Sequence, residues 1–133
     1  MNRYITNLKS LIKSIDEYKG LWFEDRSVKE GCVISYIPWT APIACEAMKF
    51  LYDNDLIITF NWADWDEGRD FFKNRNPNKY DNLDKEWVLK LLTAVARNDR
   101  FCDGAWASLF ESGDAQKLFT RLLEIEISDQ LKA

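Results

Sequence analysis

The sequence predicts a mainly α-helical, compact single domain over residues 1–133, a helical bundle of about five helices with up to two short β-strands. Three observations lead to this prediction. The chain has the length of one domain. Apolar residues make up 47% of it, which is enough for a core without disulfides or a metal. Several long segments repeat their apolar residues at helical spacing.

The N-terminal segment, residues 4–18, is the first of these helices. Its apolar residues form one helical stripe: Ile5, Leu8, Leu11, Ile12, Ile15 and Tyr18. Gly20 is a suitable stop. The charged residues 22–30 that follow show no such period, and we interpret them as irregular.

The middle of the chain is less regular. Residues 32–37 are short and β-branched, which favours an extended strand. A helix is expected over 41–52, with Thr40 as its N-cap and Pro42 in its first turn. Residues 56–60 fit either a second strand or more helix, because the segment is too short for periodicity to decide. Residues 70–73 predict a helical turn, and residues 74–82 predict a loop dense in turn formers.

The last third predicts three consecutive helices. Asp84 can cap the first, which carries apolar residues on one face between positions 87 and 96. The second is expected over 103–112, with Gly113 in the left-handed position that ends it. Asp114 can cap the third. Short connections between them predict bundle-like packing.

Charge and composition exclude several classes of protein. Lys and Arg total 18 against 22 Asp and Glu, a net charge of −4, so nucleic acid is an unfavoured partner. No run approaches the roughly 18 apolar residues of a membrane span, and no membrane association is expected. The three cysteines lie far apart with no Cys-x-x-Cys pair. We expect reduced thiols, a cytoplasmic location, and neither a metal site nor a cofactor.

The chain contains no histidine. This absence removes the usual general base at neutral pH, and it excludes Ser-His-Asp and Cys-His mechanisms within the chain. The sequence therefore favours a non-enzymatic protein without settling the matter.

The first candidate site is the segment 97–104, which holds two arginines and two aspartates around Phe101. Arg100 and Asp103 are three residues apart and would share a face, and Arg97 and Glu111 extend that row if the helix continues. These arginines could form a fork for a carboxylate or phosphate. The favoured interpretation is an Arg–Asp network that ties a helix junction together.

The second candidate site is the aromatic and acidic segment around Trp62, Asp64 and Trp65. Carboxylates and aromatic faces together could hold a cation. A divalent metal is less favoured, because the spacing of the acids does not match an EF-hand loop. The simpler interpretation, which we prefer, is that both tryptophans pack into the core while the acids remain solvated.

Several motifs in the C-terminal two-thirds resemble an uncharacterised prokaryotic and phage family, the domain of unknown function DUF6508. They are Phe60-Asn61-Trp62 with Trp65, the run 91–94, the run Arg97–Gly104, the run 111–113, and Arg121-Leu122. Such families tend to have Asp where this chain has Asn61. The resemblance implies no activity, substrate or cofactor, but it implies that Arg97, Arg100, Asp103 and Gly104 form a family signature.

These patterns lead to one functional hypothesis and one alternative. The hypothesis is a small cytoplasmic, non-enzymatic binding or adaptor protein. It would use an Arg/Asp/Trp-lined groove between the C-terminal helices and the Trp62–Trp65 segment to hold a protein or a small anionic ligand. The alternative is an enzyme that acts on a phosphorylated or nucleotide-like substrate, with Arg97 and Arg100 as a phosphate clamp. No oligomeric state follows from the sequence.

Overall fold

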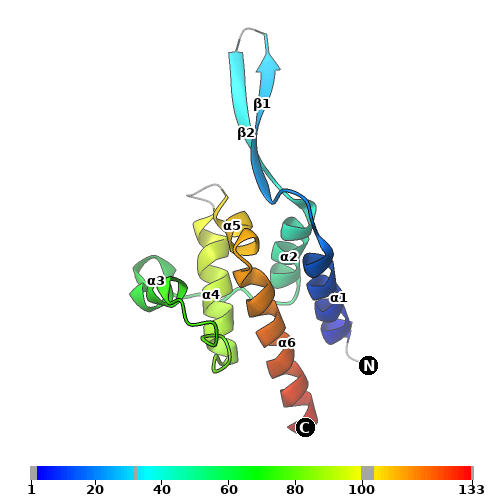
Figure 1. Cartoon of the computed structure of the whole chain (residues 1–133), viewed down its shortest axis with the longest axis vertical. Helices are drawn as coiled ribbons and strands as arrows, with labels where there is room; N and C mark the ends of the chain where they lie inside the picture. The colour runs from blue at the N-terminus through cyan, green and yellow to red at the C-terminus, as the bar shows by residue number, and fades with distance from the viewer. Residues whose placement is uncertain (1–2, 32, 100–103, 133) are drawn as a thin grey trace.

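Helices dominate the fold, as the sequence predicts (Figure 1). The structure is a computed structural model that describes residues 3–31, 33–99 and 104–132. In chain order the elements of this part are α1 (Arg3–Glu17), β1 (Phe23–Glu30), β2 (Val33–Thr40), α2 (Pro42–Asp53), the 3-10 turn η1 (Trp62–Asp64), α3 (Asp66–Lys73), α4 (Lys85–Asn98), α5 (Ala105–Glu111) and α6 (Asp114–Lys132). None of the described helices is long and apolar enough to cross a membrane.

The core forms where α6 packs against α1, α4 and α5, and where α2 joins α1 and α5. Its largest fully buried side chains are Leu8, Leu51, Val88, Leu91, Leu92, Thr93, Trp106, Leu118, Phe119 and Leu122. Each such apolar side chain contributes about 1.5–3 kcal/mol when it leaves water. The indole Nε1 of Trp106 donates a buried hydrogen bond of 2.7 Å to the carbonyl of Ala44, which ties α5 to α2.

The long periodic helices agree closely with the sequence prediction. The buried residues of α1 are Ile5, Leu8, Leu11 and Ile15. The carboxylate of Asp84 caps α4 by accepting a 2.9 Å hydrogen bond from the backbone N–H of Trp87. Gly113 has the predicted left-handed conformation, with φ of 87°. Asp114 is the first residue of α6 itself, and its carboxylate accepts hydrogen bonds from the hydroxyls of Ser112 and Tyr80.

A β-hairpin replaces the irregular segment expected at residues 22–30. Strand β1 pairs antiparallel with β2, in a register that runs from Phe23↔Thr40 to Glu30↔Val33. The expected strand at 32–37 is confirmed for the residues that β2 includes; Cys32 is outside the described residues. Figure 1 shows the hairpin projecting from the helical body. A charged strand without apolar alternation is specified by its partner strand, and its own residues do not reveal it.

The other corrections concern capping and residues 56–60. Thr40 ends β2, so Ala41 is the N-cap of α2 and has no side-chain cap, although Pro42 begins the helix as predicted. Residues 56–60 form neither strand nor helix. The backbone N–H of Ile58 donates 3.2 Å to the hydroxyl of Thr93 in α4, so a side chain takes the place of a strand partner.

Candidate functional site

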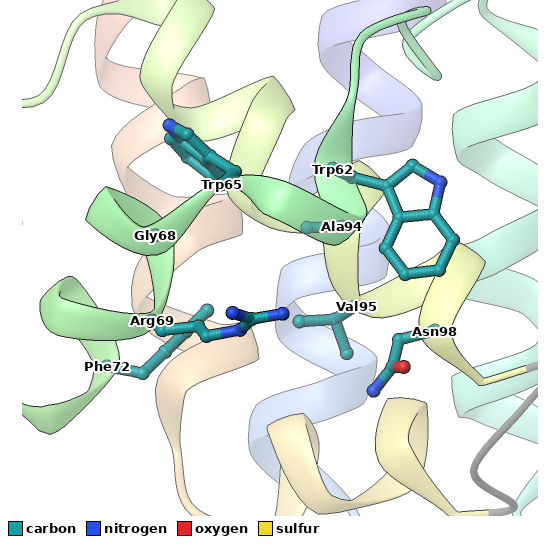
Figure 2. Close-up of a pocket in the computed structure, with 8 residues that line it drawn as sticks. All are labelled: Trp62, Trp65, Gly68, Arg69, Phe72, Ala94, Val95 and Asn98. Carbon is teal, nitrogen blue, oxygen red and sulfur yellow. The ribbon is translucent and has the colours of Figure 1, made fainter.

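A cavity of about 180 Å³ lies between α4 on one side and η1 with α3 on the other (Figure 2). Its lining residues are Trp62, Trp65, Gly68, Arg69, Phe72, Ala94, Val95 and Asn98. Of the residues proposed from the sequence for an Arg/Asp/Trp-lined groove, Trp62 and Trp65 line this cavity, whereas Asp64, Arg97 and Glu111 do not.

One face of α4 forms the floor of the cavity. Ala94 and Asn98 are four residues apart, and Val95 and Asn98 are three apart, so the three share one side of the helix. Thr93, fully buried beside them, accepts the hydrogen bond from Ile58. This bond holds the chain that leads into η1 against α4.

Trp65 forms a rigid wall of the cavity. Its ring meets Phe60 edge-on with a 5.3 Å centroid separation, and it packs at 5.1 Å against Trp87 of α4. Gly68, which is buried, lets α3 approach this ring. A Cβ at position 68 would lie 2.4 Å from Cε3 of Trp65, closer than such atoms can come. The Trp65 ring can therefore occupy this position only because residue 68 has no side chain.

Arg69 brings a fixed positive charge to the cavity. Its Nη2 donates 2.6 Å to the carbonyl of Ala63, and its Nη1 lies 3.0 Å from Oδ1 of Asp66. Figure 2 shows the guanidinium directed across the cavity toward Val95, with the ring of Trp62 and the amide of Asn98 beyond it. Two anchoring bonds to neighbouring residues limit the rotation of this side chain.

The acidic residues of the same segment lie outside the lining. Asp64, Asp66, Glu67 and Asp70 are exposed, and Asp64 accepts a 3.0 Å hydrogen bond from the amide of Asn61. The structure thus brings Trp62 and Trp65 to one cavity, whereas Asp64 does not line it. Among the described residues, no group of three or more potential metal ligands of the His, Cys, Asp and Glu types occurs.

The segment 97–104 is only partly described, because Arg100 and Asp103 lie outside the described residues. Arg97, half-buried in the last turn of α4, does not line the cavity, and Glu111 is exposed at the end of α5. The continuous helical row from Arg97 to Glu111 is wrong. The helix α4 ends at Asn98, and Gly104, with φ of 91°, precedes a separate helix.

Two described members of this segment have structural contacts. The carboxylate of Asp99 accepts a 3.0 Å hydrogen bond from the backbone N–H of Trp106, an otherwise unpaired donor in the first turn of α5. A Cβ at Gly104 would lie 3.3 Å from the ring of Phe23. Asp99 and Gly104 thus shape the junction between α4 and α5.

A second cavity, of about 290 Å³, lies beside α2 and contains Cys45. Burial raises the pKa of this thiol above its ordinary value, and the nearby carboxylates of Asp99 and Glu46 raise it further. The raised pKa disfavours the thiolate, which is the nucleophilic form. Cys45 is therefore poorly suited to covalent catalysis.

Sequence reasoning identified two walls of the first cavity but missed Gly68, Arg69, Phe72 and Asn98. The i,i+3 spacing of Asp66 and Arg69 could have suggested an anchored arginine on α3. Whether the Arg69 side chain points toward α4 depends on how α3 packs against α4. A short stretch of sequence does not reveal that packing.

Comparison with known proteins adds a family and nothing further. The profile of a family of unknown function (DUF6508) matches residues 2–128. No curated protein and no solved structure matches the chain.

Proposed function

The chain belongs to the DUF6508 family, and we propose that it is a non-enzymatic binding or adaptor protein that holds one side chain of a partner protein in the cavity between α3, η1 and α4. The observation that supports this proposal is the lining of that cavity. Three aromatic rings, those of Trp62, Trp65 and Phe72, surround it together with the anchored Arg69.

The size of the cavity favours a single side chain over a larger ligand. Small-molecule sites generally measure about 300–1,000 Å³, whereas this cavity measures about 180 Å³. A nucleotide would extend well beyond it. One ring or branched apolar side chain is of the right size, which favours a protein anchor residue over the phosphorylated or nucleotide-like substrate of the alternative hypothesis.

The chemistry of the lining also favours binding over catalysis. Among the described residues, Arg69 is the only ionisable one that lines the cavity, and a guanidinium remains charged at all accessible pH values. It therefore cannot transfer a proton as a general acid or base. Tryptophan and arginine are the residue types that contribute most to binding energy at protein interfaces. The side chain of Trp65 is held by Phe60 and Trp87, and that of Arg69 by Asp66. These two side chains would therefore lose little conformational entropy when a partner binds.

Titration with capped amino acids, followed by NMR of the tryptophan indole N–H groups, tests this proposal. N-acetyl-phenylalanine amide and N-acetyl-leucine amide should shift the Trp62 and Trp65 resonances saturably. Ala94→Leu, which fills the cavity, should abolish the shifts. Thr120→Leu, an exposed change on α6, should not.

Adenosine monophosphate and inorganic phosphate serve as contrasting probes in the same titration. If phosphate perturbs the resonances around Arg97 while the capped amino acids leave Trp62 and Trp65 unchanged, the binding proposal is wrong and a phosphate clamp is favoured. A measured turnover that depends on Arg100 or Asp103 would equally overturn the non-enzymatic assignment.

A further inference from the structure

Among the described residues, the cavity lining carries one charged side chain, that of Arg69, beside aromatic walls, and this combination restricts its occupant. Resting on the proposed function, we propose that the occupant is the C-terminal residue of a partner chain. Its ring would lie between Trp62, Trp65 and Phe72, and its terminal carboxylate would meet Arg69 and Asn98. The inference combines the charge of the lining, the unused hydrogen-bond donors and the volume of the cavity.

Arg69 retains donors that can bind an anion. A guanidinium has five N–H bonds, and the described contacts of Arg69 are the hydrogen bond to Ala63 and the ion pair with Asp66. The remaining N–H bonds have no acceptor among the described residues. Because the group is planar and already anchored, it can present two donors side by side to a carboxylate.

Asn98 offers a second donor on the opposite side of the cavity. Its side chain is exposed, and its amide has no hydrogen-bond partner within the described part of the chain. Figure 2 shows this amide below the ring of Trp62, with Val95 between it and Arg69. A carboxylate near Val95 would therefore have donors from both α3 and α4.

The sign of the charge argues against a cationic occupant. Aromatic walls can hold an ammonium group, but only where no like charge competes. Here the guanidinium of Arg69 lines the cavity, while the carboxylate of Asp66 that pairs with it lies outside the lining. A lysine or arginine of a partner would be repelled at the centre of the site.

The volume of the cavity indicates that the aromatic ring and the carboxylate of the occupant belong to one residue. A cavity of about 180 Å³ has room for roughly one large side chain. The carboxylate of a neighbouring Asp or Glu would be several bonds farther from the ring than a main-chain carboxylate. Only a chain terminus carries its carboxylate on the α-carbon of the same residue as the ring.

Isothermal titration and NMR with three matched probes test the inference. The probes are N-acetyl-phenylalanine with a free carboxylate, its primary amide, and N-acetyl-Phe-Asp-amide, whose carboxylate belongs to the next residue. We expect the free acid to bind about tenfold or more tightly than the amide, because a charge-assisted hydrogen bond exceeds a neutral one. The Phe-Asp probe should bind no more tightly than the amide.

Variants of Arg69 test whether the preference for the free acid comes from the N–H donors of its guanidinium group. Arg69→Gln should remove the preference for the acid, because it lowers the affinity for the acid far more than the affinity for the amide. Arg69→Lys, which keeps the charge, should restore only part of that preference. Arg75→Gln, an exposed change in the following loop, is the matched control. Urea unfolding of each variant establishes that α3 remains folded.

The possible outcomes separate this inference from the proposed function. Equal affinity for acid and amide, with shifts at Trp62 and Trp65, would refute the terminal carboxylate and leave a binding protein. Preference for the Phe-Asp probe would refute a chain terminus in favour of an internal acidic motif. No shift with any probe would overturn both proposals.

Discussion

Gly68 and Trp65 are in such close contact that a single methyl group between them has a measurable consequence. In Gly68→Ala, the added Cβ meets the indole ring, which Phe60 and Trp87 prevent from moving freely. Overpacking of this kind costs about 1–3 kcal/mol. We expect urea unfolding to show that loss and the Trp65 indole resonance to shift.

Asp70→Ala is the matched control, since Asp70 is exposed on the same helix. It should change the free energy of unfolding by no more than about 0.5 kcal/mol. Equal stability of the Gly68 and Asp70 variants would mean that the ring can move, and that the wall of the cavity is adaptable.

Asp99 acts on α5 through one hydrogen bond to the N–H of Trp106. Asp99→Ala leaves that donor without its acceptor, and the loss of such a capping bond costs about 0.5–2 kcal/mol. Asp99→Asn keeps an acceptor oxygen and should lose less. Denaturant unfolding of both variants checks the order. If Asp99→Ala is as stable as the wild type, the contact is not a cap.

Helices α1 and α6 meet near Tyr4, which links stability to pH. The ring of Tyr4 stacks on Phe50 of α2 at 5.7 Å. Burial raises the pKa of the Tyr4 hydroxyl well above its ordinary value, and the carboxylate of Glu126 on α6 raises it further. The folded state therefore binds the hydroxyl proton more tightly than the unfolded state does. The contribution of this group to the free energy of unfolding is fully present below the pKa of the unfolded state, and it is lost as pH rises through the pKa of the folded state.

The window for that loss begins near pH 10, the ordinary pKa of tyrosine. We expect the free energy of unfolding to fall more steeply above about pH 10 in the wild type than in Tyr4→Phe. Urea unfolding at about pH 8 and about pH 11 measures the difference. Parallel loss in both proteins would show that Tyr4 does not titrate with unfolding.

The elements differ in how far their own residues determine them. Helices α1, α4 and α6 have long apolar faces, and their periodicity predicts them, with the predicted bounds of α1 close to those observed. Strand β1 exists through its pairing with β2, and residues 56–60 take their path from the Ile58–Thr93 hydrogen bond. Neither interaction is visible in a local window of sequence.

The residues of the cavity likewise divide into those that local sequence identifies and those that only tertiary packing brings together. An unusual aromatic and acidic composition identified Trp62 and Trp65, whereas Arg69 and Asn98 became neighbours only through the packing of α3 on α4. The row from Arg97 to Glu111 requires one continuous helix, whereas α4 ends at Asn98 and Gly104 precedes the separate helix α5. Spacing can identify residues on one helix, but not the residues of two helices that face each other.

The β1–β2 hairpin lies apart from the helical body. It projects from the helical body, and β1 and β2 pair with each other (Figure 1). Glu24 pairs with Trp39, so an Asn-Gly turn can replace residues 25–38 while the base remains paired. We expect this shortened protein to keep its helical circular dichroism and its stability within about 1 kcal/mol, because loop length alone costs little.

Trp22→Ala is the contrasting variant for that experiment. The ring of Trp22 stacks on Phe110 at 5.1 Å, so the base of the hairpin contacts the core. Its loss should cost more than about 2 kcal/mol. If the shortened protein loses more stability than Trp22→Ala, the projecting strands contribute to the core energetics after all.

The indole N–H proton of Trp106, which is hydrogen-bonded to the carbonyl of Ala44, makes the separation of α2 and α5 observable. The indole ring is 1% exposed, and its N–H lies between α2 and α5. Deuterium from solvent can replace that proton only after the two helices separate, and fluctuations of surface loops do not reach it. The rate of isotope exchange at this one nitrogen therefore reports the opening that separates α2 from α5, without denaturant and without any substitution.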